Sequence, residues 1–176
     1  RPGYVELWNE EDIGQRLGSG LEGQVFETSR ATQVLHNAGL RVAGFSFSTG
    51  QPEQTDWQYV QSQGFSSVDA LSIHEYWGNQ SFTTWNALRY RSVHDWLNAN
   101  HPPMIITECG RDQVEGGGRG WRNSGVSAQQ YANELSAYDT EISKDGYVLG
   151  ATVFTAGPTP DWAAFDTDPL VSLILG

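Results

Sequence analysis

Two glutamates, Glu10 and Glu108, stand directly after short apolar segments of the chain. A carboxylate at the end of an apolar strand is held near a desolvated rim, which is costly unless the group has a task. Two such carboxylates on non-adjacent strands can face one another across the mouth of a barrel. When the environments of two carboxyl groups differ, one can work as an acid and the other as a nucleophile. Glu10 and Glu108 are therefore the candidate catalytic residues.

Other polar and aromatic residues follow the same kind of apolar segment. They form the short sequences Trp8-Asn9-Glu10, His74-Glu75-Tyr76-Trp77 and Thr107-Glu108-Cys109. In a strand, successive side chains point to opposite faces of the sheet. We therefore expect Glu75 to point away from the face that carries His74 and Tyr76.

Short apolar runs that alternate with longer amphipathic segments indicate which elements hold these residues. We predict strands over 4–8, 41–47, 70–76, 104–107 and 147–154, and helices over 21–38, 55–63, 85–100, 127–144 and 169–175. Thr84 and Ser127 are the expected N-caps of the third and fourth helices. A βα unit repeated five times predicts parallel strands with crossover helices. In such folds the chemistry gathers at the C-terminal ends of the strands, where the candidate residues stand.

The ordered motifs Trp8-Asn9-Glu10, His74-x-Tyr76 and Thr107-Glu108 resemble those of the clan A glycoside hydrolases. The resemblance covers nearly the whole chain. It implies an α/β fold of the parallel (β/α)8 TIM-barrel type, with these five units in register with strands four to eight. It also implies a retaining glycosidase that cleaves O-glycosidic bonds in a polysaccharide or oligosaccharide.

The roles of the site residues follow from this resemblance. Glu10 would protonate the leaving oxygen and later activate water, while Glu108 would attack the sugar and form a covalent glycosyl-enzyme. Retaining enzymes hold these carboxyl groups about 5–5.5 Å apart. The resemblance further implies that Asn9 binds the sugar 2-hydroxyl, that His74 lies near Glu10 and that Tyr76 donates a hydrogen bond to Glu108. The mechanism requires no metal and no organic cofactor.

Seven tryptophans are many for 176 residues and fit either core packing or stacking on sugar rings. We expect Trp77, Trp121 and Trp162, which fall in predicted loops, to form sugar platforms. Trp57, Trp85 and Trp96 fall in predicted helices and are assigned to core or surface packing. Clan A enzymes usually place a tryptophan after the last strand, and here Phe154 or Trp162 would substitute for it. The glycine-rich loop over 109–125, with Arg111, Arg119 and Arg122, is expected to wall the cleft.

A (β/α)8 barrel usually takes about 250 residues, and segments that match its first three strands are absent from these 176. We therefore expect residues 1–176 to form a single, partial TIM-barrel catalytic domain. The first three βα units would be supplied by an upstream segment of the same polypeptide or by another chain.

Charge and composition limit the classes of binding partner that we expect. The net charge of −11 repels phosphate backbones, so nucleic acid is a poor candidate partner. No apolar run approaches the ~20 residues of a membrane-spanning helix, and a membrane partner is not expected. The single cysteine, Cys109, forms no internal disulfide and is assigned to packing. A carbohydrate substrate and an extracellular or periplasmic location fit the resemblance.

Several alternatives stay open at this point. Glu10 could be a helix cap or, within the acidic run 10–12, a ligand of a hard cation such as calcium. Glu108 could pair with Arg111, and His74 could be a buried histidine without a role in chemistry. Two rival functions are a non-catalytic carbohydrate-binding protein on the same scaffold and a metal-dependent hydrolase that uses Glu10, Asp12 and His74.

Overall fold

The computed structural model describes residues 3–11, 20–79, 81–112 and 119–174. Expected residues Asp12 and Gly116–Gly118 lie outside this described part. Five strands carry the fold: β1 (Val5–Glu6), β2 (Val42–Phe47), β3 (Ala70–Trp77), β4 (Met104–Arg111) and β5 (Val148–Val153). The α-helices are α1 (Gly20–Asn37), α2 (Gln54–Ser62), α3 (Arg89–Trp96), α4 (Ala128–Ile142) and α5 (Val171–Ile174). Short 3-10 turns are η1 (Gly64–Ser67), η2 (Trp121–Asn123), η3 (Pro160–Phe165) and η4 (Asp168–Leu170).

The five strands form one sheet in the order of the chain, β1-β2-β3-β4-β5. Every neighbouring pair is parallel, with β1 beside β2 and β4 beside β5. The predicted repeat of βα units and the parallel sheet are confirmed, and the result is a partial TIM barrel. Among the described residues, no strand pairs with the outer edge of β1 or of β5.

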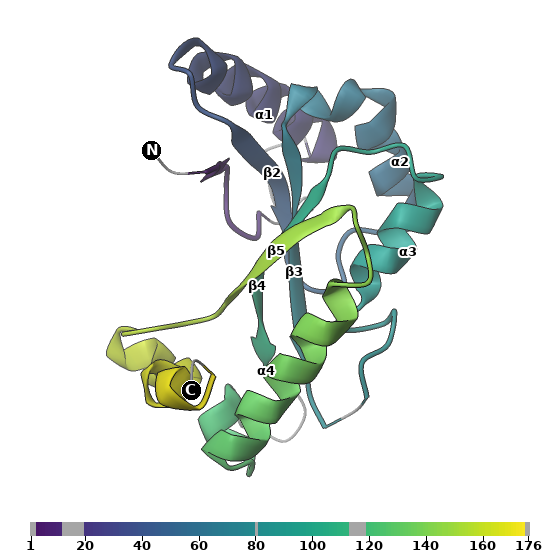
Figure 1. Ribbon diagram of the computed structural model, residues 1–176. Helices are drawn as coiled ribbons and strands as arrows, with labels where there is room; N and C mark the ends of the chain where they lie inside the picture. Colours follow the sequence, from purple (N-terminus) through teal and green to yellow (C-terminus); the bar gives the residue numbers. More distant parts are fainter. Residues whose placement is uncertain (1–2, 12–19, 80, 113–118, 175–176) are drawn as a thin grey trace.

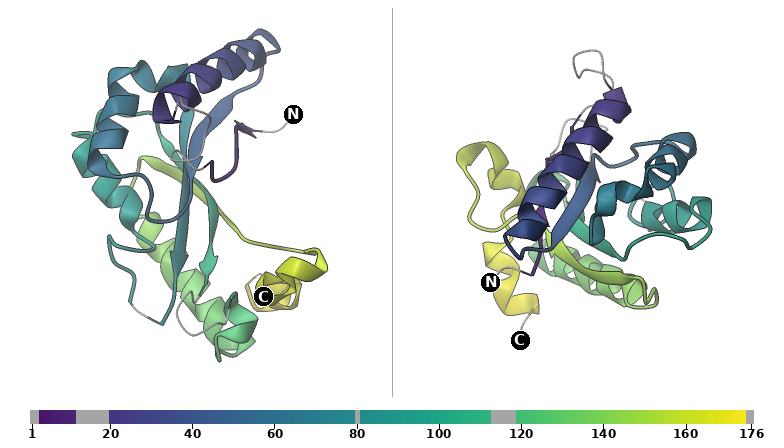
Figure 2. Two further views of the ribbon diagram at one scale, coloured as in Figure 1. Left: turned by 180° about the vertical axis from the view of Figure 1, so that it is seen from behind. Right: turned by 90° about the horizontal axis from the view of Figure 1, so that it is seen from above.

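The helices α2, α3 and α4 follow one face of the sheet, and η4 and α5, which follow β5, contact α4 (Figures 1 and 2). The core lies between the sheet and these helices. Its largest fully buried side chains include Trp57, Trp77, Tyr90, Tyr131 and Tyr138. We call the face of the sheet that these helices cover the outer face. The polar side chains that concern the site lie on the opposite, inner face.

The third helix begins later than predicted. Helix α3 starts at Arg89, not at Trp85, because Asn86 Oδ1 accepts the backbone N–H of Thr83 and holds a turn there. The backbone N–H groups of Arg89 and Tyr90 then donate to the Glu75 carboxylate, which substitutes for an N-cap. Trp85 is 83% exposed, so of the two expected alternatives core packing is wrong for this residue.

The fourth helix and fourth strand differ in how well their bounds were predicted. Ser127 is the N-cap of α4, as predicted, and it forms a capping box with Gln130. Strand β4 continues to Arg111, four residues past its predicted end, because Glu108 to Arg111 keep pairing with β3. The start of the expected loop over 109–125 is therefore strand.

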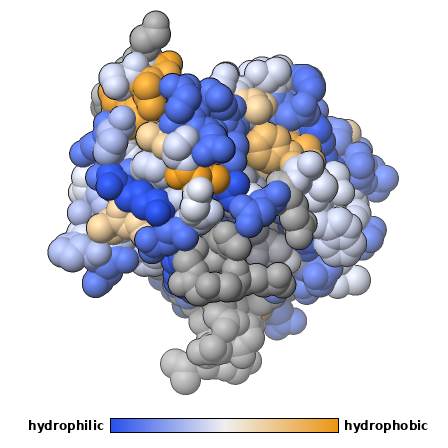
Figure 3. Space-filling model, turned by 90° about the horizontal axis from the view of Figure 1, so that it is seen from below, coloured by the Kyte–Doolittle hydropathy of each residue, from blue (hydrophilic) through white to orange (hydrophobic). Residues whose placement is uncertain are grey.

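The described residues on the face shown in Figure 3 are mostly hydrophilic. Figure 3 shows the molecule from below in Figure 1, the side toward which β4 points, and there the hydrophobic residues form a few separate patches among hydrophilic ones. None of the described helices has the length and apolarity needed to cross a bilayer.

Candidate active site

The turn after β1 places Asn9 and Glu10 at the sheet edge. Trp8 and Glu10 both adopt the left-handed backbone conformation, with φ of 63° and 48°. Such backbone is uncommon outside glycine and concentrates at functional sites. The Glu10 N–H donates to the Ser46 carbonyl at 2.8 Å, which fixes the turn against β2. The constrained turn thus carries the candidate acid/base.

Glu10 and Glu108 face each other across the inner side of the sheet. One oxygen of each carboxylate and Nδ1 of His74 all lie within 4.8 Å of one another. The Glu10 side chain is 38% exposed and that of Glu108 is 18% exposed. An approach of the two carboxylates to within 4.8 Å fits the ~5–5.5 Å spacing of retaining carboxyl pairs and not the ~6.5–9.5 Å of inverting ones.

Tyr76 and Glu108 are joined by a hydrogen bond. The Tyr76 hydroxyl donates to Glu108 Oε2 at 2.7 Å. Burial raises the pKa of the Glu108 carboxyl above its usual range, and the His74 ring and the Tyr76 hydroxyl offset that rise only in part. Burial and the Glu108 charge also raise the pKa of Tyr76, so the phenol stays a neutral donor.

His74 sits between the carboxylates with a side chain that is fully buried. Its Nδ1 lies 3.0 Å from Glu10 Oε1 and 3.6 Å from Glu108 Oε2. Burial lowers the pKa of the imidazole, but the facing carboxylates outweigh it and raise that pKa to about 9. The ring is therefore cationic at neutral pH and neutralises part of the acidic site.

Glu6 is a further residue of the site that was not predicted from the sequence. This residue ends β1, and its Oε1 accepts the Ser46 hydroxyl at 2.7 Å and lies 3.6 Å from His74 Nε2. Alternation between Val5 and Leu7 places Glu6 on the inner face, and a carboxylate inside a predicted strand is the signal that could have found it.

A cavity of about 500 Å³ opens over the two carboxylates. Its lining combines a polar part and an aromatic part: Asn9, Glu10, Ser48, Thr49, Tyr76, Glu108, Asp112, Arg119, Phe154, Trp162 and Phe165. Phe154 lies edge-on to Trp162 at 5.4 Å and to Phe165 at 5.3 Å between ring centroids. The structure thus brings together seven of the nine expected site residues, including His74, which lies behind the carboxylates.

Trp77 and Trp121 were expected as sugar platforms and do not reach this cavity. Trp77 is 2% exposed and shares the outer face of β3 with Glu75, because β3 extends one residue further than predicted and the alternation of side chains continues. Its Nε1 donates to Glu134 Oε2 at 3.0 Å. Trp121 is 6% exposed and stacks on Tyr131 with centroids 5.3 Å apart. Both side chains are core residues.

The arginines at and beyond the end of β4 have different surroundings. Arg111 pairs with Glu134 at 2.9 Å and not with Glu108, so the alternative of a Glu108–Arg111 ion pair is wrong. Arg122 pairs with Asp166 at 2.9 Å. Arg119 lines the cavity beside Asp112. Its neighbour Gly120 has φ of 78°, and a Cβ there would lie 2.5 Å from the Ala164 carbonyl oxygen, so only glycine joins this segment to η3.

Glu75 and Cys109 lie outside the cavity lining. Glu75 is fully buried on the outer face, where it accepts from the start of α3, as the alternation of β3 predicts. Burial raises the pKa of its carboxyl to about 8. Cys109 is 1% exposed, and burial raises the pKa of its thiol to about 12, which suits packing and not thiolate chemistry.

The three donors of Glu10, His74 and Glu108 are close enough to compare with a metal site. These donors already have partners, since His74 Nδ1 faces Glu10 and the Tyr76 hydroxyl binds Glu108. A metal ion would have to displace both interactions. The arrangement therefore matches a catalytic carboxyl pair better than a ligand set.

Comparison of the sequence with known proteins identifies no relative. No family model matches the chain, and no curated protein matches it. The remaining comparison is one of structure.

Solved structures of glycoside hydrolases match the fold. A family 86 β-porphyranase from the gut bacterium Bacteroides plebeius has a TM-score of 0.60 at 15% identity, over 88% of this chain and 31% of that one. A family 128 exo-β-1,3-glucanase from Aureobasidium namibiae has a TM-score of 0.60 at 15% identity, over 93% and 58%. A β-xylosidase from Caulobacter crescentus has a TM-score of 0.53 at 22% identity, over 85% and 33%.

The chain spans between about a third and three fifths of the length of these proteins. At such identities the likeness concerns the fold. It confirms the partial TIM-barrel fold that the resemblance in the sequence implied, and the five βα units match part of the barrels of these glycoside hydrolases.

Proposed function

We propose that this protein is a retaining glycoside hydrolase that cleaves O-glycosidic bonds in a polysaccharide or oligosaccharide. The observation that carries the proposal is the approach of the Glu10 and Glu108 carboxylates to within 4.8 Å, beside an open cavity. That spacing suits a nucleophile in direct reach of the sugar and leaves no room for a water between carboxylate and substrate.

Each carboxylate has surroundings that suit its role. Glu108 is the less exposed of the two, and the Tyr76 hydroxyl orients it for attack on the anomeric carbon. Glu10 is the more exposed and faces His74, from which it can regain a proton. The first displacement breaks the glycosidic bond as Glu10 protonates the leaving oxygen. In the second, Glu10 takes a proton from water, whose oxygen replaces Glu108 on the sugar.

The cavity lining supports a sugar ligand. Tyr76, Phe154, Trp162 and Phe165 form an apolar wall for the C–H face of a sugar ring. Asn9, Ser48 and Thr49 offer hydrogen-bonding groups on the opposite, polar part of the lining. Trp162 is 41% exposed and is the best-placed platform for the role that clan A enzymes usually give to a tryptophan after the last strand.

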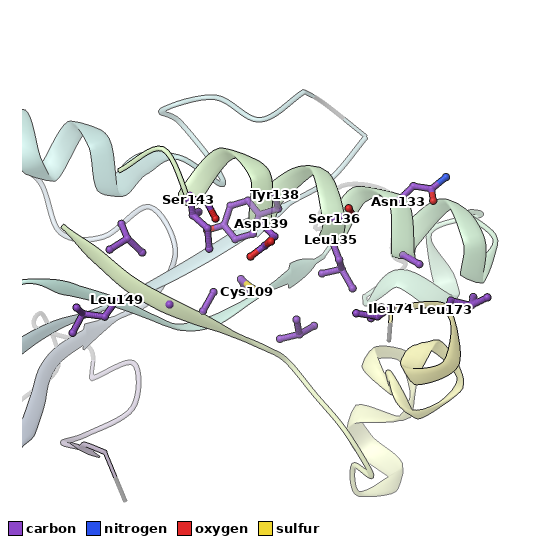
Figure 4. A pocket seen from close by; sticks show the side chains of 16 residues that line it. Cys109, Asn133, Leu135, Ser136, Tyr138, Asp139, Ser143, Leu149, Leu173 and Ile174 are labelled. Atoms are coloured by element: carbon purple, nitrogen blue, oxygen red, sulfur yellow. The ribbon is translucent and has the colours of Figure 1, made fainter. Parts of the chain in front are cut away.

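We further propose that the barrel is completed by βα units from the same polypeptide or another chain. The outer edge of β5 has no partner among the described strands, and Leu149 on β5 is 53% exposed. Beside it, a groove of about 600 Å³ runs between α4, β5 and α5 (Figure 4). Its apolar residues include Leu135, Leu173 and Ile174. A helix and a strand seated there would cover this apolar surface.

A substrate that is a polymer would be met outside the cytoplasm. We therefore propose an extracellular or periplasmic site of action. Detection of the native protein in the medium or periplasmic fraction, with a cytoplasmic enzyme as a fractionation control, tests this location.

The test of activity is a panel of mechanism-based fluoroglycosides read by intact mass. It uses the chain in the longest natural polypeptide that contains it, and the chain mixed with any separate barrel segment. Trapping of one sugar on Glu108, abolished in E108Q, is the expected result. Labelling of another residue, or turnover that inverts the anomeric configuration, overturns the assignment.

Two further measurements separate the rivals. Loss of activity on chelation, restored by a divalent cation, would favour the metal-dependent hydrolase. Retained glycan binding without turnover by the completed barrel would favour a carbohydrate-binding protein. For barrel completion, a light-scattering mass of one 176-residue chain together with full activity and cooperative unfolding would contradict the proposal.

A further inference from the structure

His74 presents each ring nitrogen to a different carboxylate. Nδ1 lies 3.0 Å from Glu10 Oε1, and Nε2 lies 3.6 Å from Glu6 Oε1. The ring is fully buried, so water does not substitute for either partner. Among the described residues Nε2 makes no hydrogen bond, and Glu6 is the carboxylate that faces it at ion-pair distance. Glu10 and, at 3.6 Å, Glu108 face Nδ1, whereas Glu6 faces Nε2, so these three carboxylates set the positions of the imidazole protons.

Glu6 is itself fixed in place. The Ser46 hydroxyl on β2 donates to its Oε1 at 2.7 Å, and its carboxylate belongs to β1, the strand that leads into Glu10. Burial raises the pKa of the Glu6 carboxyl, but the His74 ring and the hydroxyls of Thr107 and Ser46 together outweigh burial and hold that pKa below its usual range. Glu6 is thus a permanent negative charge behind the histidine.

We infer that Glu6 is a positioning residue that keeps a proton on Nε2 of His74, so that Nδ1 can exchange a proton with Glu10. The inference rests on the proposed role of Glu10 as acid/base. Glu6 lies on the far side of the ring from Glu10 and acts through the imidazole.

The proton balance of the cycle supports this role. At rest the Glu10–His74 pair holds one exchangeable proton, on Glu10 or on Nδ1. That proton leaves with the departing sugar hydroxyl, and the pair becomes singly negative. In the second step water gives one proton back to the pair and its oxygen to the sugar. Throughout, the Nε2 proton stays opposite Glu6, which is why the ring keeps the tautomer that serves Glu10.

Among the described groups that face His74, none is a cation that could balance the charges of the carboxylates. From β1 and its turn come Glu6 and Glu10, from β4 comes Glu108, and from β2 only the neutral Ser46. Glu75, next to His74 on β3, points to the opposite face. Removal of the Glu6 charge should therefore lower the proton affinity of the Glu10–His74 pair.

The test combines an NMR titration with kinetics. Imidazole nitrogen chemical shifts of the 15N-labelled protein report the tautomer and the pKa of His74. The protein has four histidines, and the signal that is missing from a spectrum of His74→Gln is the signal of His74. In the wild type we expect Nε2 to be protonated throughout. In E6Q the pKa of His74 should fall by about one unit or more, because an opposite charge at this range shifts a pKa by about 1–3 units. The alkaline limb of the kcat/KM profile should fall with it.

Two variants serve as controls. E6D keeps the charge and should recover at least half of both shifts. D95N removes an exposed carboxylate on α3 and should change neither. An unchanged His74 pKa in folded E6Q overturns the inference. If E6Q does not fold, a wild-type ring that is protonated on Nδ1 alone overturns it equally. Because the NMR measurement needs no turnover, a failure here is distinguishable from a failure of the proposed function.

Discussion

The hydroxyl of Tyr76 donates a hydrogen bond of 2.7 Å to Oε2 of Glu108, from one strand to its neighbour. This bond orients the carboxylate and favours its charged form. In Y76F we expect kcat/KM to fall about 10- to 100-fold, since a hydrogen bond to a charged group contributes about 1.5–3 kcal/mol. The acid limb of the pH profile should move to higher pH, because loss of the donor raises the pKa of Glu108 further.

Tyr138→Phe is the matched control for this change. Its hydroxyl is buried on the outer face and has no hydrogen-bond partner among the described residues. Y138F should leave the pH profile unchanged. Equal effects of Y76F and Y138F on kcat/KM would show that the hydrogen bond to Glu108 does not contribute to catalysis.

Trp162 should contribute to binding and little to stability. It lines the cavity and is 41% exposed, so W162A removes a sugar-stacking surface without opening the core. We expect KM, or the Kd of an oligosaccharide measured by calorimetry, to rise about fivefold, equivalent to ~1 kcal/mol. W85A removes a tryptophan that is 83% exposed and away from the cavity lining, and it should change neither quantity. Equal losses in the two variants would contradict the platform role.

Glu75 should make stability fall as the pH rises. The folded state raises the pKa of this buried carboxyl from its usual 4.5 to about 8. Folded protein therefore holds a proton that the unfolded chain releases, so this contribution is complete below about pH 4.5 and is lost as the pH rises through about 8. Above pH 8, E75Q should be more stable than the wild type by about 4–5 kcal/mol, because each unit of pKa difference corresponds to about 1.4 kcal/mol.

Denaturant unfolding at pH 5 and pH 8.5 measures this difference. Near pH 5 the two proteins should have similar stability, because the side chain at position 75 is uncharged in both folded proteins. In the wild type it is a protonated carboxyl, and in E75Q it is an amide. E22Q, an exposed substitution on α1, is the control and should follow the wild type. A constant difference between E75Q and the wild type at both pH values would contradict the assignment.

The ion pairs of Arg111 and Arg122 should differ in their effect on stability. Arg111 is 5% exposed and its partner Glu134 also accepts Trp77 Nε1, so R111A leaves a partly buried carboxylate uncompensated. We expect R111A to lower the free energy of unfolding by about 3 kcal/mol. R122A breaks a pair whose arginine is 38% exposed and should lower it by less than about 1 kcal/mol. Similar losses for both would show that burial does not decide the outcome.

The fold and the main site residues could be predicted because both follow from local patterns. Five apolar runs separated by amphipathic segments lead to a parallel sheet, and such a sheet brings residues at strand ends to one edge. Glu10, Glu108, His74 and Tyr76 meet there for this reason. The Ser127 cap was visible because it depends on residues three positions apart.

The errors have a physical cause in longer-range interactions. Trp77 was expected in a loop because nothing in the sequence shows that β4 keeps pairing with β3 as far as Arg111. The late start of α3 depends on Glu75, which is 14 residues before Arg89 in the chain. Glu6 was overlooked because its importance comes from His74 and Ser46, both distant in sequence.

The order of the strands has a consequence for handling the protein. With β1 and β5 at its borders, the sheet offers two rows of backbone donors and acceptors that another copy can pair with. The net charge of −11 makes copies repel one another, and this repulsion weakens as salt shortens the screening distance. We therefore expect solutions of the isolated chain to be clearer in dilute buffer than at high salt.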